Sequence, residues 1–110
     1  MADNSICMVY ITTKDKAEAR AVGKVLVEEH YAACANIIDG MHSLFFWEGV
    51  LEDDSETVLI VKTQTCLVDK LTERVKTIHS YDVPCVVALP ITGGNPDYIQ
   101  WVCKETAAAL

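Results

Sequence analysis

Residues 33–47 read ACANIIDGMHSLFFW, and residues 57–63 read TVLIVKT. Both stretches are rich in β-branched, aromatic and small side chains, which is typical of strands. In the first stretch Asp39-Gly40 interrupts the apolar pattern, so we expect a bulge or bend there. The residues between them, Glu48 to Glu56, are polar and acidic around Gly49, which indicates the tip of a hairpin. The sequence therefore predicts two successive antiparallel strands in the middle of the chain.

A helix is predicted on each side of this hairpin. Thr12 followed by Asp15 resembles a capping box, and apolar residues then recur at helical spacing over about residues 14–29. Beyond the hairpin, apolar residues repeat at i, i+4, i+8 and i+11 from Leu67, which predicts a second helix that ends at about His79.

Two further strands and a terminal helix complete the chain. The continuous apolar run Ile6–Ile11 indicates a strand that is buried on both faces. A second apolar run, 84–91, is a strand with Pro84 and Pro90 at its ends. Asn95-Pro96-Asp97 then supplies an N-cap, a proline at the first helical position and an acid in the first turn, so a helix follows that contains Tyr98, Trp101 and Val102.

The predicted order βαββαβ is that of an α+β, ferredoxin-like fold. We expect a four-stranded antiparallel sheet with both helices on one face, plus the C-terminal helix, built from residues 1–110 as a single domain. Because two helices cover only one face, part of the other face stays bare.

The charge excludes several classes of partner. The formal net charge is −7, and the nine Lys and Arg residues are scattered, so we expect neither nucleic acid nor an anionic membrane as a partner. No apolar stretch approaches the ~20 residues of a membrane-spanning helix. The segment Met1–Ser5 carries no positive charge ahead of the first apolar run, unlike a signal peptide, so we expect a cytoplasmic protein. The five cysteines form no CxxC pair, which argues against a disulfide framework or a zinc finger.

The first hairpin strand carries more apolar side chains than one face can bury. Successive side chains of a strand point to opposite faces, so Phe45, Phe46 and Trp47 cannot all contact the two helices. An exposed aromatic patch of this kind marks an interface, which predicts a homo-oligomer. The alternative is an ordinary core strand that Tyr98 and Trp101 of the C-terminal helix cover.

Polar groups collect at the end of the second helix. His79 is a candidate metal ligand, and Asp82 is a candidate second ligand or a group that orients the ring. The alternative is structural, because the helix dipole favours a histidine near a helix C-terminus.

Two further residues are candidates for a functional site. Cys34 is flanked by small residues, and its use as a nucleophile requires a nearby base such as His30, His42 or His79. Lys62 lies in an apolar strand, where a charge is costly unless it meets a carboxylate, such as that of Glu48 or of a neighbouring subunit, or reaches a cleft. The acidic residues of the hairpin tip lack the order of a calcium loop and indicate a solvated loop.

Several motifs in the same order and spacing resemble the CutA divalent-cation tolerance family, and they run from the first strand to the terminal helix: residues 32–37 (AACANI), 43–49 (SLFFWEG), Lys62-Thr63, 79–84 (HSYDVP), 88–91 (ALPI), Gly94-Asn95, Tyr98 and Trp101. The resemblance implies a stable trimer of ferredoxin-like protomers whose long hairpin strands reach into neighbours. It implies no established reaction.

The family's bacterial copper site carries over in part. The resemblance puts Ile11 at the position of its cysteine and Ile78 at the position of the first of two adjacent histidines, so only His79 remains. A soft copper site needs thiolate or several imidazoles, so one protomer alone is expected to bind copper poorly.

The leading interpretation is therefore a trimeric protein of divalent metal ion tolerance or homeostasis, which binds copper or another divalent cation, requires no cofactor and is not an enzyme. The alternative is a regulatory module similar to the PII signalling proteins, with a small-molecule cleft between subunits lined by Cys34, Glu48, Lys62 and Tyr81. A third alternative is a hydrolase that uses Cys34 or His79.

Overall fold

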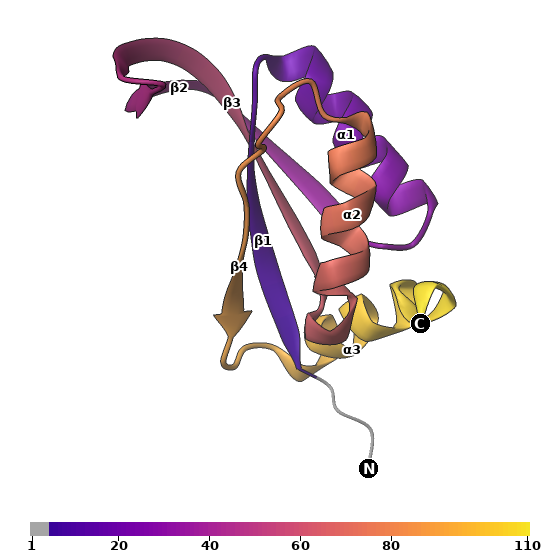
Figure 1. Ribbon diagram of the computed structural model, residues 1–110. Coiled ribbons are helices and arrows are strands. Elements are labelled where there is room, and N and C mark those ends of the chain that lie inside the picture. The colour runs from indigo at the N-terminus through magenta and orange to yellow at the C-terminus, as the bar shows by residue number, and fades with distance from the viewer. Residues whose placement is uncertain (1–4) are drawn as a thin grey trace.

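The computed structural model describes residues 5–110. Its elements, shown in Figure 1, are β1 (Ile6–Thr13), α1 (Lys16–Glu28), β2 (Cys34–Trp47), β3 (Val50–Gln64), the 3₁₀ turn η1 (Thr65–Leu67), α2 (Val68–Ile78), β4 (Val86–Ile91), α3 (Pro96–Glu105) and the 3₁₀ turn η2 (Ala107–Ala109). The strands form one four-stranded sheet in the order β2-β3-β1-β4, and every neighbouring pair is antiparallel. The predicted α+β class and βαββαβ order are confirmed.

The core lies between the sheet and the two helices α1 and α2, which cover the same face (Figure 1). Cys7, Val9 and Ile11 of β1 are buried there. Met8 and Tyr10 alternate with them and point to the opposite face, where they are half-buried. The prediction that β1 is buried on both faces is therefore wrong for one protomer, because no helix covers this part of the second face.

We call this second face the open face. The strand register places these residues on it: Met8, Tyr10, Cys34, Asn36, Ile38, Ile60, Lys62, Val87 and Leu89. Most of them are apolar, and Ile38, Val87 and Leu89 are each about half exposed. The bare sheet face that the sequence predicts is present.

The third helix, α3, covers the end of the open face at which β1 begins (Figure 1). Val102 packs with Ile6 in a small second cluster. Gln64 Nε2 donates to the carbonyl of Cys103 at 3.2 Å and to Thr106 Oγ1 at 3.0 Å, so β3 also holds the end of α3. As predicted, α3 begins with Asn95 as its N-cap and Pro96 in its first turn.

The start of α1 differs from the prediction. The strand β1 continues to Thr13, so Thr12 is not the cap. Asp15 is the N-cap, and its Oδ1 accepts from the backbone N–H of Glu18 at 2.8 Å. Glu18 Oε1 in turn accepts from the backbone N–H of Lys14 at 3.1 Å. The helix therefore begins at Lys16, two residues later than expected.

The hairpin of β2 and β3 is longer than predicted, and its tip is smaller. Trp47 pairs with Val50, and the two residues between them, Glu48 and Gly49, have φ values of 50° and 81°. Positive φ at both positions is the mark of a tight two-residue hairpin turn, which glycine tolerates well. The acidic residues 52–56 are therefore not a loop but part of β3.

We call residues 41–56, which extend past the rest of the sheet, the arm (Figure 1). At its base the register shifts between Ile38 and Met41, and Gly40 has a φ of 83°. The bulge predicted at Asp39-Gly40 is confirmed.

The last strand, β4, begins at Val86 rather than at Pro84, and Pro90 lies within it. As an edge strand, β4 tolerates a residue without an N–H.

Candidate functional site

A groove lies between the arm and the loop that follows α2. It has a volume of about 780 Å³ and is lined by Thr12, Ser43, Leu44, Phe45, Trp47, Glu52, Asp54, Glu56, Ser80, Tyr81, Asp82, Val83 and Cys85. This lining contains four carboxylates and no basic side chain, together with an apolar and aromatic wall. We call it the acidic groove.

His79 is the C-cap of α2, at the start of this loop, and its side chain is fully buried. Its Nε2 lies 2.8 Å from the carbonyl oxygen of Thr12, and its Nδ1 accepts from the backbone N–H of Tyr81 at 3.0 Å. A carbonyl oxygen only accepts, so Nε2 carries the proton and donates, while the Nδ1 lone pair is already used. Within one protomer, His79 therefore has no lone pair free for a metal.

The same loop is anchored to the arm by Tyr81. Its hydroxyl donates to Glu56 Oε2 at 2.9 Å, and Glu56 is buried. Burial, together with the hydrogen bond to the Glu56 carboxylate, raises the pKa of Tyr81 far above its usual value, so the hydroxyl stays protonated. Burial and the nearby Glu56 carboxylate also raise the pKa of the Cys85 thiol. A protonated thiol is a poor metal ligand.

Asp82, the other predicted ligand, is exposed at the rim of the acidic groove. Among residues 5–110, no group of three or more His, Cys, Asp and Glu side chains is arranged to hold a metal ion. The metal role of His79 and Asp82 therefore stays a prediction that concerns the assembled protein.

The residues predicted to line one cleft fall into three places. Cys34 and Lys62 are neighbours on the open face, because they are directly paired across β2 and β3. Tyr81 lies in the acidic groove, and Glu48 lies in the turn at the tip of the arm. Within one protomer Glu48 therefore does not meet Lys62, and a cleft between subunits that contains both stays a prediction.

The neighbours of Cys34 and Lys62 were not predicted. Lys62 Nζ donates to Asn36 Oδ1 at 2.9 Å, and Cys34 Sγ lies 3.5 Å from the hydroxyl of Tyr98. The pairing register would have revealed Asn36, since it lies two residues from Cys34 on the same strand face. In the described part of the chain Cys34 forms no hydrogen bond with a histidine, so the base that the hydrolase alternative requires is not paired with it in one protomer.

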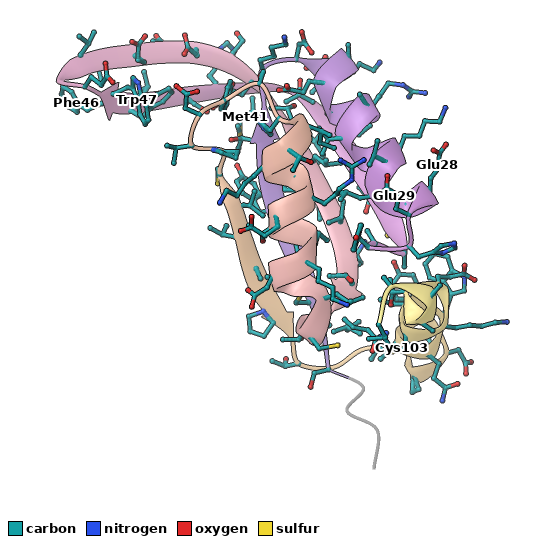
Figure 2. The ribbon with its side chains drawn as sticks, turned by 45° about the vertical axis from the view of Figure 1, so that its right-hand side comes forward. Glu28, Glu29, Met41, Phe46, Trp47 and Cys103 are labelled. Atoms are coloured by element: carbon teal, nitrogen blue, oxygen red, sulfur yellow. The ribbon has the colours of Figure 1, made fainter. Side chains whose placement is uncertain are left out.

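The aromatic side chains of the arm remain exposed in the protomer. Phe46 is 73% exposed and Trp47 is 46% exposed, and Figure 2 shows both far from the helices. Tyr98 and Trp101 belong to α3, at the opposite end of the sheet. The alternative in which the C-terminal helix covers the aromatic strand is therefore wrong.

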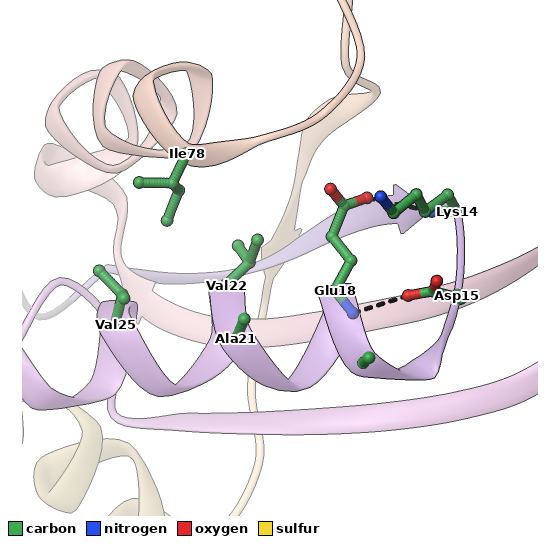
Figure 3. Close-up of a pocket in the computed structure, with 8 residues that line it drawn as sticks. Lys14, Asp15, Glu18, Ala21, Val22, Val25 and Ile78 are labelled. Carbon is green, nitrogen blue, oxygen red and sulfur yellow. Dashed lines mark hydrogen bonds between the residues drawn. The ribbon is translucent and has the colours of Figure 1, made fainter.

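A second, smaller depression of about 380 Å³ lies between the start of α1 and Ile78 at the end of α2 (Figure 3). Its lining is mostly apolar, and its one glutamate is Glu18, whose backbone N–H bonds to the Asp15 cap. Glu18 Oε2 also accepts from the backbone N–H of Ser80 at 3.0 Å. The Glu18 carboxylate of this depression therefore links α1 to the loop after α2.

None of the helices within residues 5–110 is both long and apolar enough to cross a bilayer.

The family model described as CutA1 divalent ion tolerance protein matches residues 7–105, from β1 to the end of α3. The "Divalent-cation tolerance protein CutA" of Thermus thermophilus is 46% identical over 99 residues, which cover 90% of this chain and 96% of that relative.

Plant relatives are longer than this chain. The rice "Protein CutA 1, chloroplastic" is 44% identical over 99 residues, which cover 90% of this chain and 56% of the rice protein, so the chain spans about half of its length. The crystal structure of CutA1 from Oryza sativa superposes with a TM-score of 0.90 at 43% identity and covers 93% of this chain and 94% of that one. None of these names states an enzymatic activity. Similarity that extends through every strand and all three helices shows that the chain belongs to the CutA1 divalent ion tolerance family.

Proposed function

We propose that this protein acts in divalent-cation tolerance as a homotrimer that binds cations and does not catalyse a reaction. Its family and the names of its relatives support the role in tolerance. The exposed apolar side chains of the arm support assembly, because a contiguous apolar surface is stabilised when a second copy covers it. The number three comes from the family resemblance.

The observation that carries cation binding is the acidic groove, which has four carboxylates and no basic side chain. Carboxylates are ligands for hard and intermediate divalent cations. Since no three ligands converge within the described part of one chain, the remaining ligands come from a second copy. Copper needs softer ligands than this groove offers, because the lone pairs of His79 are used and the Cys85 thiol is protonated.

Calorimetric titration of Mn²⁺ and of Cu²⁺ into the full chain tests this proposal. The double variant Asp54→Asn/Asp82→Asn removes two groove carboxylates and is expected to weaken Mn²⁺ binding by about tenfold or more. The matched control, Glu28→Gln/Glu73→Gln, removes two exposed helix carboxylates and the same net charge, and should bind as the unaltered protein does. Equal Mn²⁺ affinity of the two double variants would contradict the proposed site.

We also propose a cytoplasmic location. All five thiols lie in the described part of the chain and none is in a disulfide, which a reducing compartment favours. Microscopy of the tagged full-length protein tests this, and localisation to another compartment would contradict it.

A further inference from the structure

Lys62 carries a positive charge on the mostly apolar open face. The strand register puts Met8 on one side of it and Cys34 on the other, and Ile60 precedes it on the same face. No carboxylate forms an ion pair with Lys62 anywhere in residues 5–110. A half-buried ammonium without a counter-ion is unfavourable, because burial weakens its hydration and no opposite charge compensates for the loss.

The polar groups around Lys62 leave donors rather than acceptors free. The Lys62 ammonium has three N–H donors, of which one meets Asn36 Oδ1 at 2.9 Å and one lies toward Cys34 Sγ at 3.8 Å. Because the ammonium only donates, the Asn36 amide must turn its oxygen to Lys62, which leaves the Asn36 NH₂ group directed elsewhere. The Tyr98 hydroxyl is a further hydrogen-bond partner of Lys62. The Asn36 NH₂ group has no acceptor in the described part of the chain. An ammonium whose partners are all neutral, with an amide NH₂ group beside it, is suited to an oxyanion.

An aromatic wall stands beside these donors. The Tyr98 ring centroid lies 5.8 Å from Lys62 Nζ, and the rings of Tyr98 and Trp101 are 5.6 Å apart. Both rings are 39% exposed, so a flat ligand group can reach them. The hydrogen bond to Cys34, together with burial, raises the pKa of Tyr98, which keeps its hydroxyl protonated and uncharged next to the site.

We propose that Lys62 and Asn36, with Tyr98 and Trp101 beside them, form a binding site for a small organic anion with a planar group. Its carboxylate or phosphate oxygens accept from the Lys62 ammonium and the Asn36 amide, and its planar group packs on the two aromatic rings. Lys62 lies six positions along β3 from Glu56, at the base of the arm, which corresponds to roughly 20 Å. The site is therefore distinct from the acidic groove and does not depend on cation binding there.

Calorimetry with the full-length protein and simple probes tests the chemistry. Phenyl phosphate and benzoate are expected to bind at millimolar or lower concentrations, and the tighter of the two identifies the preferred oxyanion. Benzylamine has the same ring with the opposite charge and should not bind. If neither anion binds, or if benzylamine binds as well as they do, the proposal is wrong.

The thiols give a second measurement that locates the site. Cys34 lies against Lys62 and Tyr98, whereas Cys66 is exposed in η1 and serves as an internal control. Bound phenyl phosphate should slow alkylation of Cys34 by N-ethylmaleimide, as followed by peptide mass spectrometry, and leave Cys66 unaffected. Binding without protection of Cys34 would place the anion elsewhere and overturn the assignment.

Matched variants distinguish an effect of the Lys62 charge on binding from a general loss of the fold. Lys62→Met keeps the aliphatic stem and should weaken binding about tenfold or more, whereas Lys62→Arg should retain most of it. Asn36→Asp should also abolish binding, because it supplies the missing counter-ion to Lys62 and repels the probe. Lys104→Met removes an exposed lysine from α3 and is the control. Unchanged binding by Lys62→Met, or an equal loss in Lys104→Met, would overturn the proposal, whatever the outcome of the Mn²⁺ titration.

Discussion

The hydroxyl of Tyr81 donates a 2.9 Å hydrogen bond to Glu56 Oε2, which ties the loop after α2 to the base of the arm. These residues are 25 positions apart in the sequence, and Glu56 is one of the few buried carboxylates. Both residues line the acidic groove, so this contact links its two walls.

Tyr81→Phe is expected to destabilise the protein by about 1–3 kcal/mol, because it leaves a buried carboxylate without its donor. The free energy of unfolding in urea, measured at one fixed protein concentration, checks this. Tyr31→Phe is the control, since the Tyr31 hydroxyl makes no hydrogen bond within residues 5–110. Equal stability of the Tyr81→Phe and unaltered proteins would show that the contact is not formed in solution.

His79→Ala separates a structural role from a metal-binding role. The substitution removes the partners of the Thr12 carbonyl and the Tyr81 N–H and leaves a small cavity, so we expect a loss of roughly 2–4 kcal/mol of stability. Copper uptake per folded chain, measured by equilibrium dialysis, should not change. A clear loss of uptake would instead establish His79 as a ligand.

Glu18 gives a pH dependence with a defined sign. Burial acts to raise its pKa, but hydrogen bonds from Ser80 and Lys14 outweigh it, and the pKa lies below its usual value of 4.5. A lowered pKa in the folded state means that the ionised group stabilises the fold above about pH 4.5 and that this contribution is lost as the pH falls through the folded pKa.

Glu18→Gln should therefore cost stability near neutral pH, and the difference from the unaltered protein should shrink in acid. Urea unfolding at a series of pH values measures this difference. The control Glu73→Gln removes an exposed carboxylate that accepts only from Lys76. A difference that grows in acid would show that the sign is wrong.

At Gly23 the helix α1 packs closely against the sheet. A Cβ at this position would lie 3.0 Å from Ala35 Cβ and 3.1 Å from Leu59 Cδ1. Gly23→Ala gains about 1 kcal/mol in helix propensity, but overpacking costs about 1–3 kcal/mol, and Ala35 Cβ cannot rotate away. We expect a net loss of stability by thermal unfolding, whereas Lys24→Ala on the exposed side of α1 should have little effect. A more stable Gly23→Ala protein would contradict this packing.

The order of the elements could be predicted from the sequence because most carry a clear apolar period. The exception is the first half of β3, where residues 52–56 are acidic or polar. Their composition is typical of a loop, yet they form a strand because each pairs with a residue of β2. Local composition does not reveal such pairing.

The candidate site could be predicted only in part, because its contacts depend on register and on hydrogen bonds. His79 and Tyr81 were singled out from the sequence, but the acceptor of the His79 ring is a backbone carbonyl of β1, 67 residues away. Lys62 was recognised as a charge that needs a partner, and its partners Asn36 and Tyr98 come from a paired strand and from α3. The spacing of these residues along the chain does not indicate that they are in contact.

The central claim is assembly through the apolar arm, and sedimentation equilibrium of the full chain at micromolar concentration tests it most directly. We predict a mass of about three times the 12.1 kDa chain. Phe46→Glu should lower this mass, whereas Leu110→Glu, which alters a residue of similar exposure at the chain end, should not. A single-chain mass for the unaltered protein would contradict the account.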